Sequence, residues 1–132
     1  MSSIVFAGKS NTETLIKRCT FIKNYAVTGG VFYAESWSKI RCEHCVFDHN
    51  FAFKGGVAYA QGDGIIEIIS SEFMQNFALA GPTIMLFDNN GVSSFIDDSL
   101  FEANNGFSFE DLKTEIYEYC TLLCYFKESF RI

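Results

Sequence analysis

Two histidines, five cysteines and 16 carboxylates are the side chains of this chain that could perform chemistry. Cys42 and Cys45 have the spacing found in zinc and redox sites, and His44 and His49 lie beside them in the sequence. In the repeat described below, Cys42 stands in an isoleucine position and Cys45 repeats Cys19, so both cysteines are interpreted as core residues. No repeat position assembles histidine with cysteines or carboxylates at ligand spacing. The sequence therefore predicts surface histidines, no metal site and no cofactor.

Carboxylates would support cleavage of a polysaccharide if several converged on a groove. Asp48, Glu72 and Glu102 recur near one position of the repeat, and Asp97 and Asp98 lie near another. Other residue types interrupt both sets, and few long loops are available to wall a cleft. We therefore assign no catalytic residue and expect no enzyme. A remnant of a polysaccharide lyase or hydrolase, that is, of a carbohydrate-active enzyme, is the alternative.

Length and composition indicate one compact unit of 132 residues with an ample core, because 48% of the residues are hydrophobic and 15 are phenylalanine. A net charge of −6 and scattered basic residues argue against nucleic-acid binding. No run of about 18 apolar residues is present, so we expect no membrane insertion by this segment. The start lacks the pattern of a secretory signal, and Val5-Phe6 aligns with Val31-Phe32. We therefore expect a fragment, with further coils N-terminal to residue 1.

The elements that would position these residues follow a repeat. The pattern Cys19-x-Phe21-x-x-Asn24-x-Ala26 recurs after 26 residues at Cys45 and again at Ser71, and a fourth copy begins at Ser99 after 28 residues. Self-similarity at a fixed period in this range is typical of a solenoid, in which each unit buries its apolar face only against its neighbours.

Two columns of the repeat are expected to form ladders along the solenoid. The asparagines would stack so that each amide bonds the coils above and below, and the phenylalanines would lie over one another in the core. The predicted ladder residues are Asn24, Asn50, Asn76 and Asn104, with Phe21, Phe47, Phe73 and Phe101.

Two kinds of solenoid compete for this pattern. Leucine-rich repeats share the spacing from Ile16 to Ala26, but they usually return through a helix. Here the returning arc contains Gly55-Gly56 followed by β-favouring residues and would be a poor helix. We therefore predict an all-β solenoid over residues 1–107, a right-handed parallel β-helix of about four 26-residue coils. Each coil should contain three short strands and two corners.

The unit C/S-x-F-x-x-N-x-A-x-x-G-G-V resembles the repeats of polymorphic outer-membrane proteins over roughly residues 4–107. Those repeats occur in chlamydial autotransporter passengers and in large surface proteins of several protists. The resemblance implies a pectin-lyase-like β-helix at the cell surface or secreted, with a role in adhesion. This chain departs from the pattern at Gly81-Pro82 and at Phe109, and no autotransporter barrel follows, so the resemblance does not imply membrane insertion.

Residues 108–132 have a different pattern and are predicted to form a C-terminal amphipathic helix. Ser108 and Asp111 have the spacing of a capping box, and the helix should extend from 109 to 129. It would cover the open end of the solenoid or bind a partner. Apolar residues follow at steps of three and four, namely Leu112, Ile116, Tyr119, Leu123, Phe126 and Phe130.

The cysteine count is odd, so the five cysteines cannot all pair within the chain. Cys19 and Cys45 hold equivalent positions on neighbouring coils, which lie close enough for a disulfide. The same column continues with Ser71 and Ser99, which favours a small core position. A Cys19–Cys45 disulfide and two free thiols therefore both remain open. Cys120 and Cys124 are interpreted as packing residues on one helix side.

Tyr25, Phe51 and Phe77 form an aromatic column that strand alternation directs outward. Stacked there, they would provide an exposed stripe for a protein or carbohydrate ligand, unless they pack under an adjacent loop. The function expected from the sequence is a non-catalytic structural or interaction segment of a larger surface or secreted β-helix protein. A truncated gene product with no role of its own is a further possibility.

Overall fold

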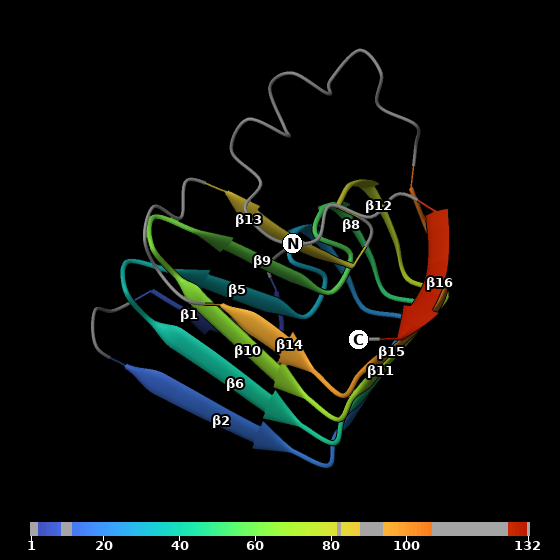
Figure 1. The fold of residues 1–132 in the computed structure, drawn as a ribbon. Helices are drawn as coiled ribbons and strands as arrows, with labels where there is room; N and C mark the ends of the chain where they lie inside the picture. Colours follow the sequence, from blue (N-terminus) through green and yellow to red (C-terminus); the bar gives the residue numbers. More distant parts are fainter. Residues whose placement is uncertain (1–2, 9–11, 82, 88–93, 107–126, 132) are drawn as a thin grey trace.

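The computed structural model describes residues 3–8, 12–81, 83–87, 94–106 and 127–131. In these residues the chain forms an all-β parallel solenoid of about three turns of 26 residues (Figure 1). The predicted solenoid is therefore confirmed, but the described part completes three turns rather than four. One strand of a turn lies ahead of these three, and two strands of a further turn follow them.

The strands stack in three sheets. Sheet A contains β1 (Val5–Ala7), β5 (Phe32–Glu35), β9 (Ala58–Gln61) and β13 (Ile84–Phe87). Sheet B contains β2 (Glu13–Lys17), β6 (Lys39–Glu43), β10 (Ile65–Ile69) and β14 (Phe95–Asp97). Sheet C contains β3 (Thr20–Ile22), β7 (Val46–Asp48), β11 (Glu72–Met74) and β15 (Leu100–Gly106), and also β12 (Phe77–Ala80), β8 (Phe51–Lys54) and β4 (Tyr25–Thr28).

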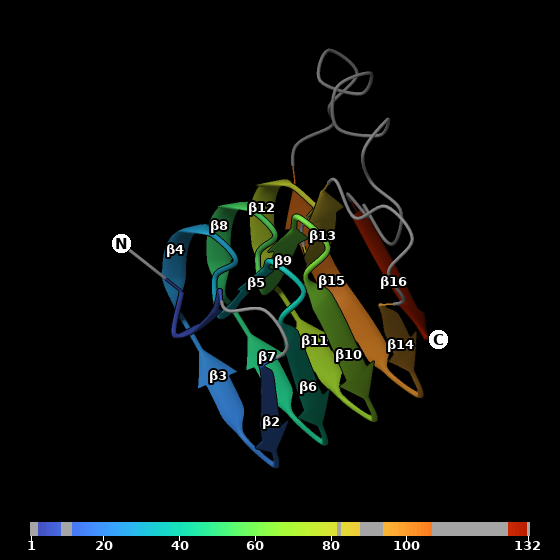
Figure 2. The same cartoon turned by 90° about the vertical axis from the view of Figure 1, so that its left-hand side faces the viewer.

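Each full turn therefore contains four strands, and not the three predicted. Sheet C receives two of them, for example β7 and β8, which a bend at His49 and Asn50 separates. In the last turn the same path is one strand, β15, which pairs with both β11 and β12. Figure 2 shows successive turns lying side by side in the order in which the chain makes them.

Non-glycine residues in the left-handed region form two of the corners in each turn. Their N–H groups bond the carbonyl of the next turn, as for His44 to Ile69 and His49 to Met74, both at 3.0 Å, so pairing continues through the bend. These hydrogen bonds offset a conformational cost of roughly 1–2 kcal/mol per corner. The corner residues are Arg18, His44, Ser70 and Asp98, and Lys23, His49, Gln75 and Ala103.

Glycine forms the third corner, where the predicted Gly-Gly pair lies. Gly55 has φ 61°, and a Cβ at this position would overlap the carbonyl oxygen of Ala58. After this corner, the arc that a leucine-rich repeat would usually close with a helix is the strand β9, buried at Ala58, Tyr59 and Ala60. The turn thus returns through a sheet.

A phenylalanine stack fills the interior behind sheet C. Successive rings of Phe21, Phe47, Phe73 and Phe101 are 5.3, 4.8 and 4.5 Å apart between centroids and lie within 13° of parallel. Phe32 packs edge-on against the first two rings. Phe47 and Phe73 are fully buried, so the predicted aromatic column is a continuous core element.

The asparagines form a ladder of hydrogen bonds along the same axis. The Oδ1 atom of Asn76 accepts from both the backbone N–H and the Nδ2 of Asn50, each at 2.9 Å. Asn76 Nδ2 donates in turn to Asn104 Oδ1 and to the Phe47 carbonyl, also at 2.9 Å. The ladder joins Asn24, Asn50, Asn76 and Asn104. Asn50 and Asn76 are fully buried, and both use their complete amide capacity.

The cysteine and serine column contributes a second ladder that the sequence did not indicate. The backbone N–H of Cys45 donates to Ser71 Oγ at 3.1 Å, and that of Ser71 donates to Ser99 Oγ at 3.2 Å. Each serine hydroxyl donates to the carbonyl two residues earlier in its own turn. This column is therefore polar in the later turns and not only a tight apolar position.

The C-terminal segment departs from the predicted helix where the structure describes it. Residues Lys127–Arg131 form β16, which pairs antiparallel with β15 and places Phe130 opposite Phe101. The predicted helix extended to 129, so its last residues are strand, while residues 108–126 lie outside the described part. Unpaired backbone groups on the edge of β15 explain the change, because a strand satisfies them directly and a helix does not.

Replacing Asn76 by alanine should lower the free energy of unfolding by about 2–4 kcal/mol, since it leaves buried Asn50 donors and the Phe47 carbonyl without partners. The matched variant Asn24→Ala removes one side-chain bond at the end of the ladder and should cost about 1 kcal/mol. Urea denaturation followed by circular dichroism measures both. Equal losses of unfolding free energy in the two variants would contradict the claim that the buried asparagines stabilise the ladder more than the one at its end.

Candidate functional site

The aromatic column predicted on the outer side of the solenoid lies on β4, β8 and β12. Its residues, Tyr25, Phe51 and Phe77, are direct register partners. The alanines that follow them along each strand are fully buried, so strand alternation does direct the rings outward. Two further side chains, Val27 and Phe53, share this outer face because they lie two residues beyond Tyr25 and Phe51. We call these five residues the apolar face.

The rings of the apolar face stack on one another. The Tyr25 and Phe51 centroids are 5.0 Å apart and those of Phe51 and Phe77 are 5.4 Å apart, with interplanar angles of 3° and 6°. Phe53 packs at a steep angle against both Tyr25 and Phe51. Tyr25, Val27 and Phe53 remain 42%, 49% and 41% exposed. The apolar face is thus a rigid, solvent-accessible surface, and no loop of the described residues covers it.

The orientation of the stack determines which contacts are available to a ligand. Because the three rings lie parallel along the solenoid axis, the faces between them are turned to one another and their edges point outward, while the outer face of Tyr25 has no ring neighbour in the described residues. Ring edges carry partial positive charge and attract carbonyl oxygens and other ring faces, whereas a sugar ring stacks on an exposed aromatic face. The outward edges of the stack can therefore contact apolar and carbonyl groups.

Sheet B presents a charged outer surface whose members neutralise one another. Arg41 contacts Glu43 at 2.8 Å and Glu67 at 3.0 Å, and these carboxylates also bind Lys17 and Lys39 at 2.9 and 3.0 Å. Hydrogen bonding to Arg41, and then to Lys17, lowers the pKa of the Glu43 carboxyl. The same bonding, first to Glu43, raises the pKa of Arg41. This face therefore offers few uncompensated charges to a ligand.

Sheet A has an outer aromatic column that sequence analysis missed. Phe6, Tyr33 and Tyr59 stack at 5.2 and 5.6 Å between centroids, and Tyr59 is nearly fully buried. The Tyr33 hydroxyl lies 3.1 Å from Glu35 Oε2, which also accepts a hydrogen bond from Gln61. Burial, reinforced by Glu35, raises the pKa of Tyr33 to about 12, and burial alone raises the pKa of Tyr59 to about 12.

The candidate catalytic carboxylates are only partly brought together. Asp48 and Glu102 line a recess of about 270 Å³ with His49, whose Nδ1 lies 2.7 Å from Asp48 Oδ1. Their strands, β7 and β15, lie on either side of β11, so the two carboxyl groups are separated by two strand spacings, roughly 10 Å. Glu72 is in a different column of β11, and it does not line the recess.

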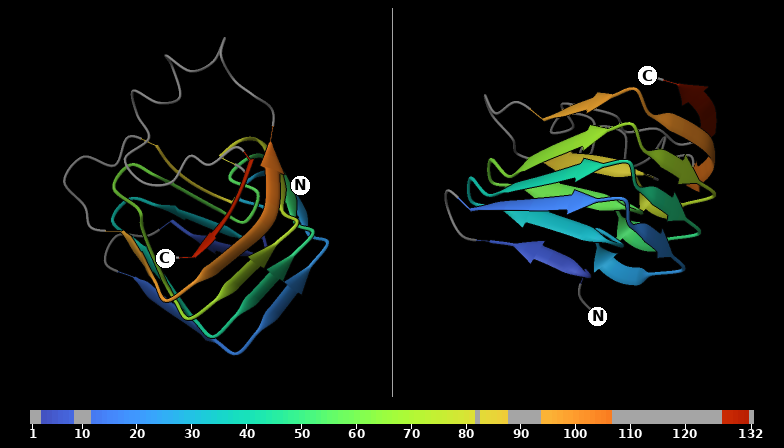
Figure 3. Two further views of the ribbon diagram at one scale, coloured as in Figure 1. Left: turned by 45° about the vertical axis from the view of Figure 1, so that its right-hand side comes forward. Right: turned by 90° about the horizontal axis from the view of Figure 1, so that it is seen from below.

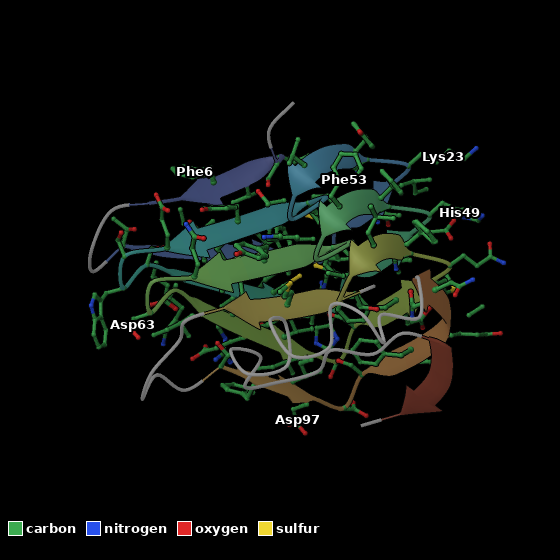
Figure 4. All side chains as sticks on the ribbon, turned by 90° about the horizontal axis from the view of Figure 1, so that it is seen from above. Phe6, Lys23, His49, Phe53, Asp63 and Asp97 are labelled. Carbon is green, nitrogen blue, oxygen red and sulfur yellow. The ribbon has the colours of Figure 1, made fainter. Side chains whose placement is uncertain are left out.

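The two other candidate carboxylates, Asp97 and Asp98, and both histidines lie on the surface. Asp97 and Asp98 are exposed, and Asp98 accepts a hydrogen bond from Ser70 Oγ at 3.1 Å. His44 and His49 are exposed at two corners, and Figure 4 shows His49 and Lys23 pointing outward on successive turns. The predicted surface position of both histidines is confirmed.

Cys42 and Cys45 are each only 1% exposed and belong to the core cluster, as interpreted from the sequence. Cys19, Cys42 and Cys45 are free thiols, so the Cys19–Cys45 disulfide left open by the sequence is not formed. Burial raises the pKa of the Cys42 thiol. Within the described ranges, no three His, Cys, Asp or Glu side chains lie together as a metal site requires. None of the described segments is a helix long and apolar enough to cross a membrane.

A second recess, of about 300 Å³, lies beside the single tryptophan. Thr12, Glu13, Trp37, Lys39 and Ile65 line it, and Trp37 is 54% exposed. Trp37 also has a φ of 62°, a left-handed conformation that glycine or asparagine adopts more readily. Sequence reasoning did not single it out, because the equivalent turn of the next coil is Gly62-Asp63 and repeats no aromatic residue.

Comparison of the chain with protein-family models, with curated proteins and with solved structures finds no match in any of the three. The architecture therefore rests on the strand pairing described above, and the resemblance to polymorphic outer-membrane proteins gains no support as a family identity.

The tyrosines of sheet A should make stability fall as pH rises from about 10 to about 12. In that window an unfolded tyrosine, with an ordinary pKa of 10.0, loses its proton, while Tyr33 and Tyr59 keep theirs, so ionisation favours the unfolded state. Urea denaturation across this range should show the loss in the parent chain. The double variant Tyr33→Phe, Tyr59→Phe should show a flatter profile; an unchanged slope would contradict the assignment.

Proposed function

We propose that this chain is a non-catalytic structural and interaction segment of a larger β-solenoid protein, and that a protein partner binds the apolar face. The supporting observation is the stack of Tyr25, Phe51 and Phe77, which is held on three successive strands and remains solvent-accessible together with Val27 and Phe53. Its mechanism is geometric, because stacked turns keep the outward rings in fixed positions and little conformational entropy is lost on binding.

The three outer surfaces support this choice of site. Sheet B pairs its central charges internally and exposes Leu15, and in the ring column of sheet A only Phe6 is strongly exposed because Tyr59 is buried, whereas the apolar face groups three large side chains that are more than 40% exposed. Aromatic residues are enriched where protein partners bind. A carbohydrate ligand is the second possibility, and the outward ring edges are less suited to it.

Several finer features of the proposal come from the repeat pattern. The handedness is proposed as right-handed, since parallel strands joined by crossovers are nearly always connected in that sense. The resemblance to polymorphic outer-membrane proteins supports a cell-surface or secreted location and a role in adhesion. On this proposal, further coils continue the solenoid ahead of residue 1.

The triple variant Tyr25→Ser, Phe51→Ser, Phe77→Ser tests the apolar face. Peptides selected from a displayed random library against the unmodified chain should bind the triple variant at least about tenfold more weakly, because the variant lacks the ring edges that a bound peptide would cover. Leu15→Ser, which removes a similarly exposed residue from sheet B, is the matched control and should leave binding unchanged. A glycan array probed with the same proteins tests whether a carbohydrate binds the apolar face instead.

Circular dichroism and urea denaturation establish that the triple variant is folded before binding is measured. Peptides that bind the triple variant as tightly as the parent would remove the apolar face from the proposal. Glycan binding that depends on these residues, without any peptide binding, would reassign the ligand class.

The alternative of a carbohydrate-active enzyme remnant is favoured by one observation, that Asp48 and Glu102 line the same recess. We expect no turnover of polygalacturonate or related glycans, with or without calcium, because the separation of roughly 10 Å between the two carboxyl groups exceeds the about 5–5.5 Å of retaining and about 6.5–9.5 Å of inverting glycosidases. Reducing-end and elimination-product assays measure this. Turnover that is lost in Asp48→Asn, Asp97→Asn or Asp98→Asn would overturn the non-catalytic proposal.

A further inference from the structure

The two ends of the solenoid are finished differently. At the C-terminal end, β16 pairs with the outermost strand of sheet C, β15. At the other end, β2, β3 and β4 each have a neighbour on one side only, and no strand of the described ranges lies beyond them. Figure 3 shows the N-terminus at this end and the C-terminus at the opposite one.

Backbone groups of β3 and β4 point toward this open side. In the next turn, the N–H of Val46 donates to the Cys19 carbonyl and that of Phe51 to the Asn24 carbonyl, at 2.9 and 2.8 Å. Thr20 and Tyr25 are the register partners of Val46 and Phe51, so their N–H groups point the same way, to where no described strand lies. An edge of this kind is a template for strand addition.

The side chain of Asn24 specifies what the added strand must offer. Each later ladder oxygen, on Asn50, Asn76 and Asn104, accepts two hydrogen bonds from the preceding turn. Asn24 Nδ2 donates to Asn50 at 2.8 Å, but its own Oδ1 receives no donor from the described residues. The vacant acceptor matches the N–H and the amide of another asparagine, one turn earlier.

The core is also incomplete at this end. Phe47, Phe73 and Phe101 are at most 1% exposed, whereas Phe21 is only half-buried, as is Cys19 beside fully buried Cys45. The described residues include nine exposed large apolar side chains, and six of them lie before residue 28, although those of Phe6, Tyr25 and Val27 belong to the outer faces and not to the core. These six are Ile4, Phe6, Leu15, Ile22, Tyr25 and Val27.

The position of β1 indicates where the missing strands would connect. It pairs with β5 in the same parallel manner in which β5 pairs with β9, so it is the sheet A strand of an earlier turn. The three other strand positions of that turn, above β2, β3 and β4, are unoccupied by described residues.

We propose that the edge formed by β2, β3 and β4 is a docking surface for one further turn of the same repeat, whose chain leads into β1. The occupant is a segment with a Phe-x-x-Asn pattern that runs parallel to β3 and β4. Its phenylalanine stacks on Phe21, and its asparagine donates to Asn24 Oδ1. This inference rests on the proposed function, in that the chain is part of a longer solenoid, and it identifies the contacts that join the two parts.

An extended chain tests the docking surface. A second copy of residues 39–55 is placed directly ahead of Ser3 in the full chain, which puts the copied strands in register with β2, β3 and β4. Amide hydrogen exchange should slow at least about tenfold at Thr20 and Tyr25, and the unfolding temperature should rise. The matched control is the same extension in which the copy carries Phe47→Ala and Asn50→Ala, and it should protect these amides much less.

Four results would overturn the proposal. One is unchanged exchange at Thr20 and Tyr25 in the extended chain, and another is equal protection by the control copy. The third is loss of protection at Phe73 in the interior, since a turn that docks cannot disrupt the turns beneath it. If the unextended chain instead sediments as a dimer with protected Thr20 and Tyr25, a second copy occupies the edge and the proposal fails. Peptide binding to the apolar face is measured separately, so either hypothesis can fail alone.

Discussion

Hydrogen bonds between successive turns determine where every side chain of this solenoid lies. Because they continue through the left-handed corners, as at His44 and His49, one turn cannot slide past the next without breaking all of them. Register is therefore shared by the whole stack. A residue type that suits the interior in one turn must suit it in the next, which produces the phenylalanine and asparagine columns. The buried amides depend on this alignment, since a displaced Asn50 would leave several polar groups without partners.

The outer surfaces are free of that constraint, and the three sheets use the freedom differently. Sheet B forms ion pairs between neighbouring turns, such as that of Arg41 with Glu67. Sheet A packs tyrosines against one another, and strands β4, β8 and β12 of sheet C carry the exposed stack of rings. An interior that repeats and exteriors that differ are what a scaffold for recognition requires. Specific function in such a protein depends on outward residues, and the ladder residues serve stability.

The interior was predicted well from the sequence, because in a stacked solenoid residues that are one repeat apart in the sequence lie in contact. Phe21, Phe47 and Phe73 could be placed over one another from spacing alone, and so could the asparagines. The corners could not be predicted, because arginine, histidine, serine and aspartate share no conformational preference that separates them from a strand. The only feature that the corner residues share is their position in the repeat. One corner lies directly before the cysteine and serine column, and the other lies directly before the asparagine.

The features outside the repeat were harder to predict. The steps of three and four that end at Phe130 fit a helix face, but the described end of that segment pairs with β15 as a strand, since an open sheet edge favours strand addition over local periodicity. Phe53 and Val27 could have been found by carrying the alternation two residues beyond Phe51 and Tyr25. The Phe6 and Tyr33 pair was obscured because β1 lies 27 residues, and not 26, ahead of its partner, as the pair Val5 and Phe32 shows.

A one-dimensional stack makes its two proposed interaction surfaces dependent on each other. Each turn is stabilised only by its neighbours, and β3 and β4 pair with a described strand on one side only, whereas β7 and β8 of the next turn pair on both sides. Tyr25 belongs to this outer turn and is also the first ring of the apolar face. A turn docked on β4 would cover the outer face of the Tyr25 ring and place its own side chain at the next register position of the apolar face. The edge and the apolar face therefore share one strand, and a turn that occupies the edge would also lengthen the surface that a partner contacts.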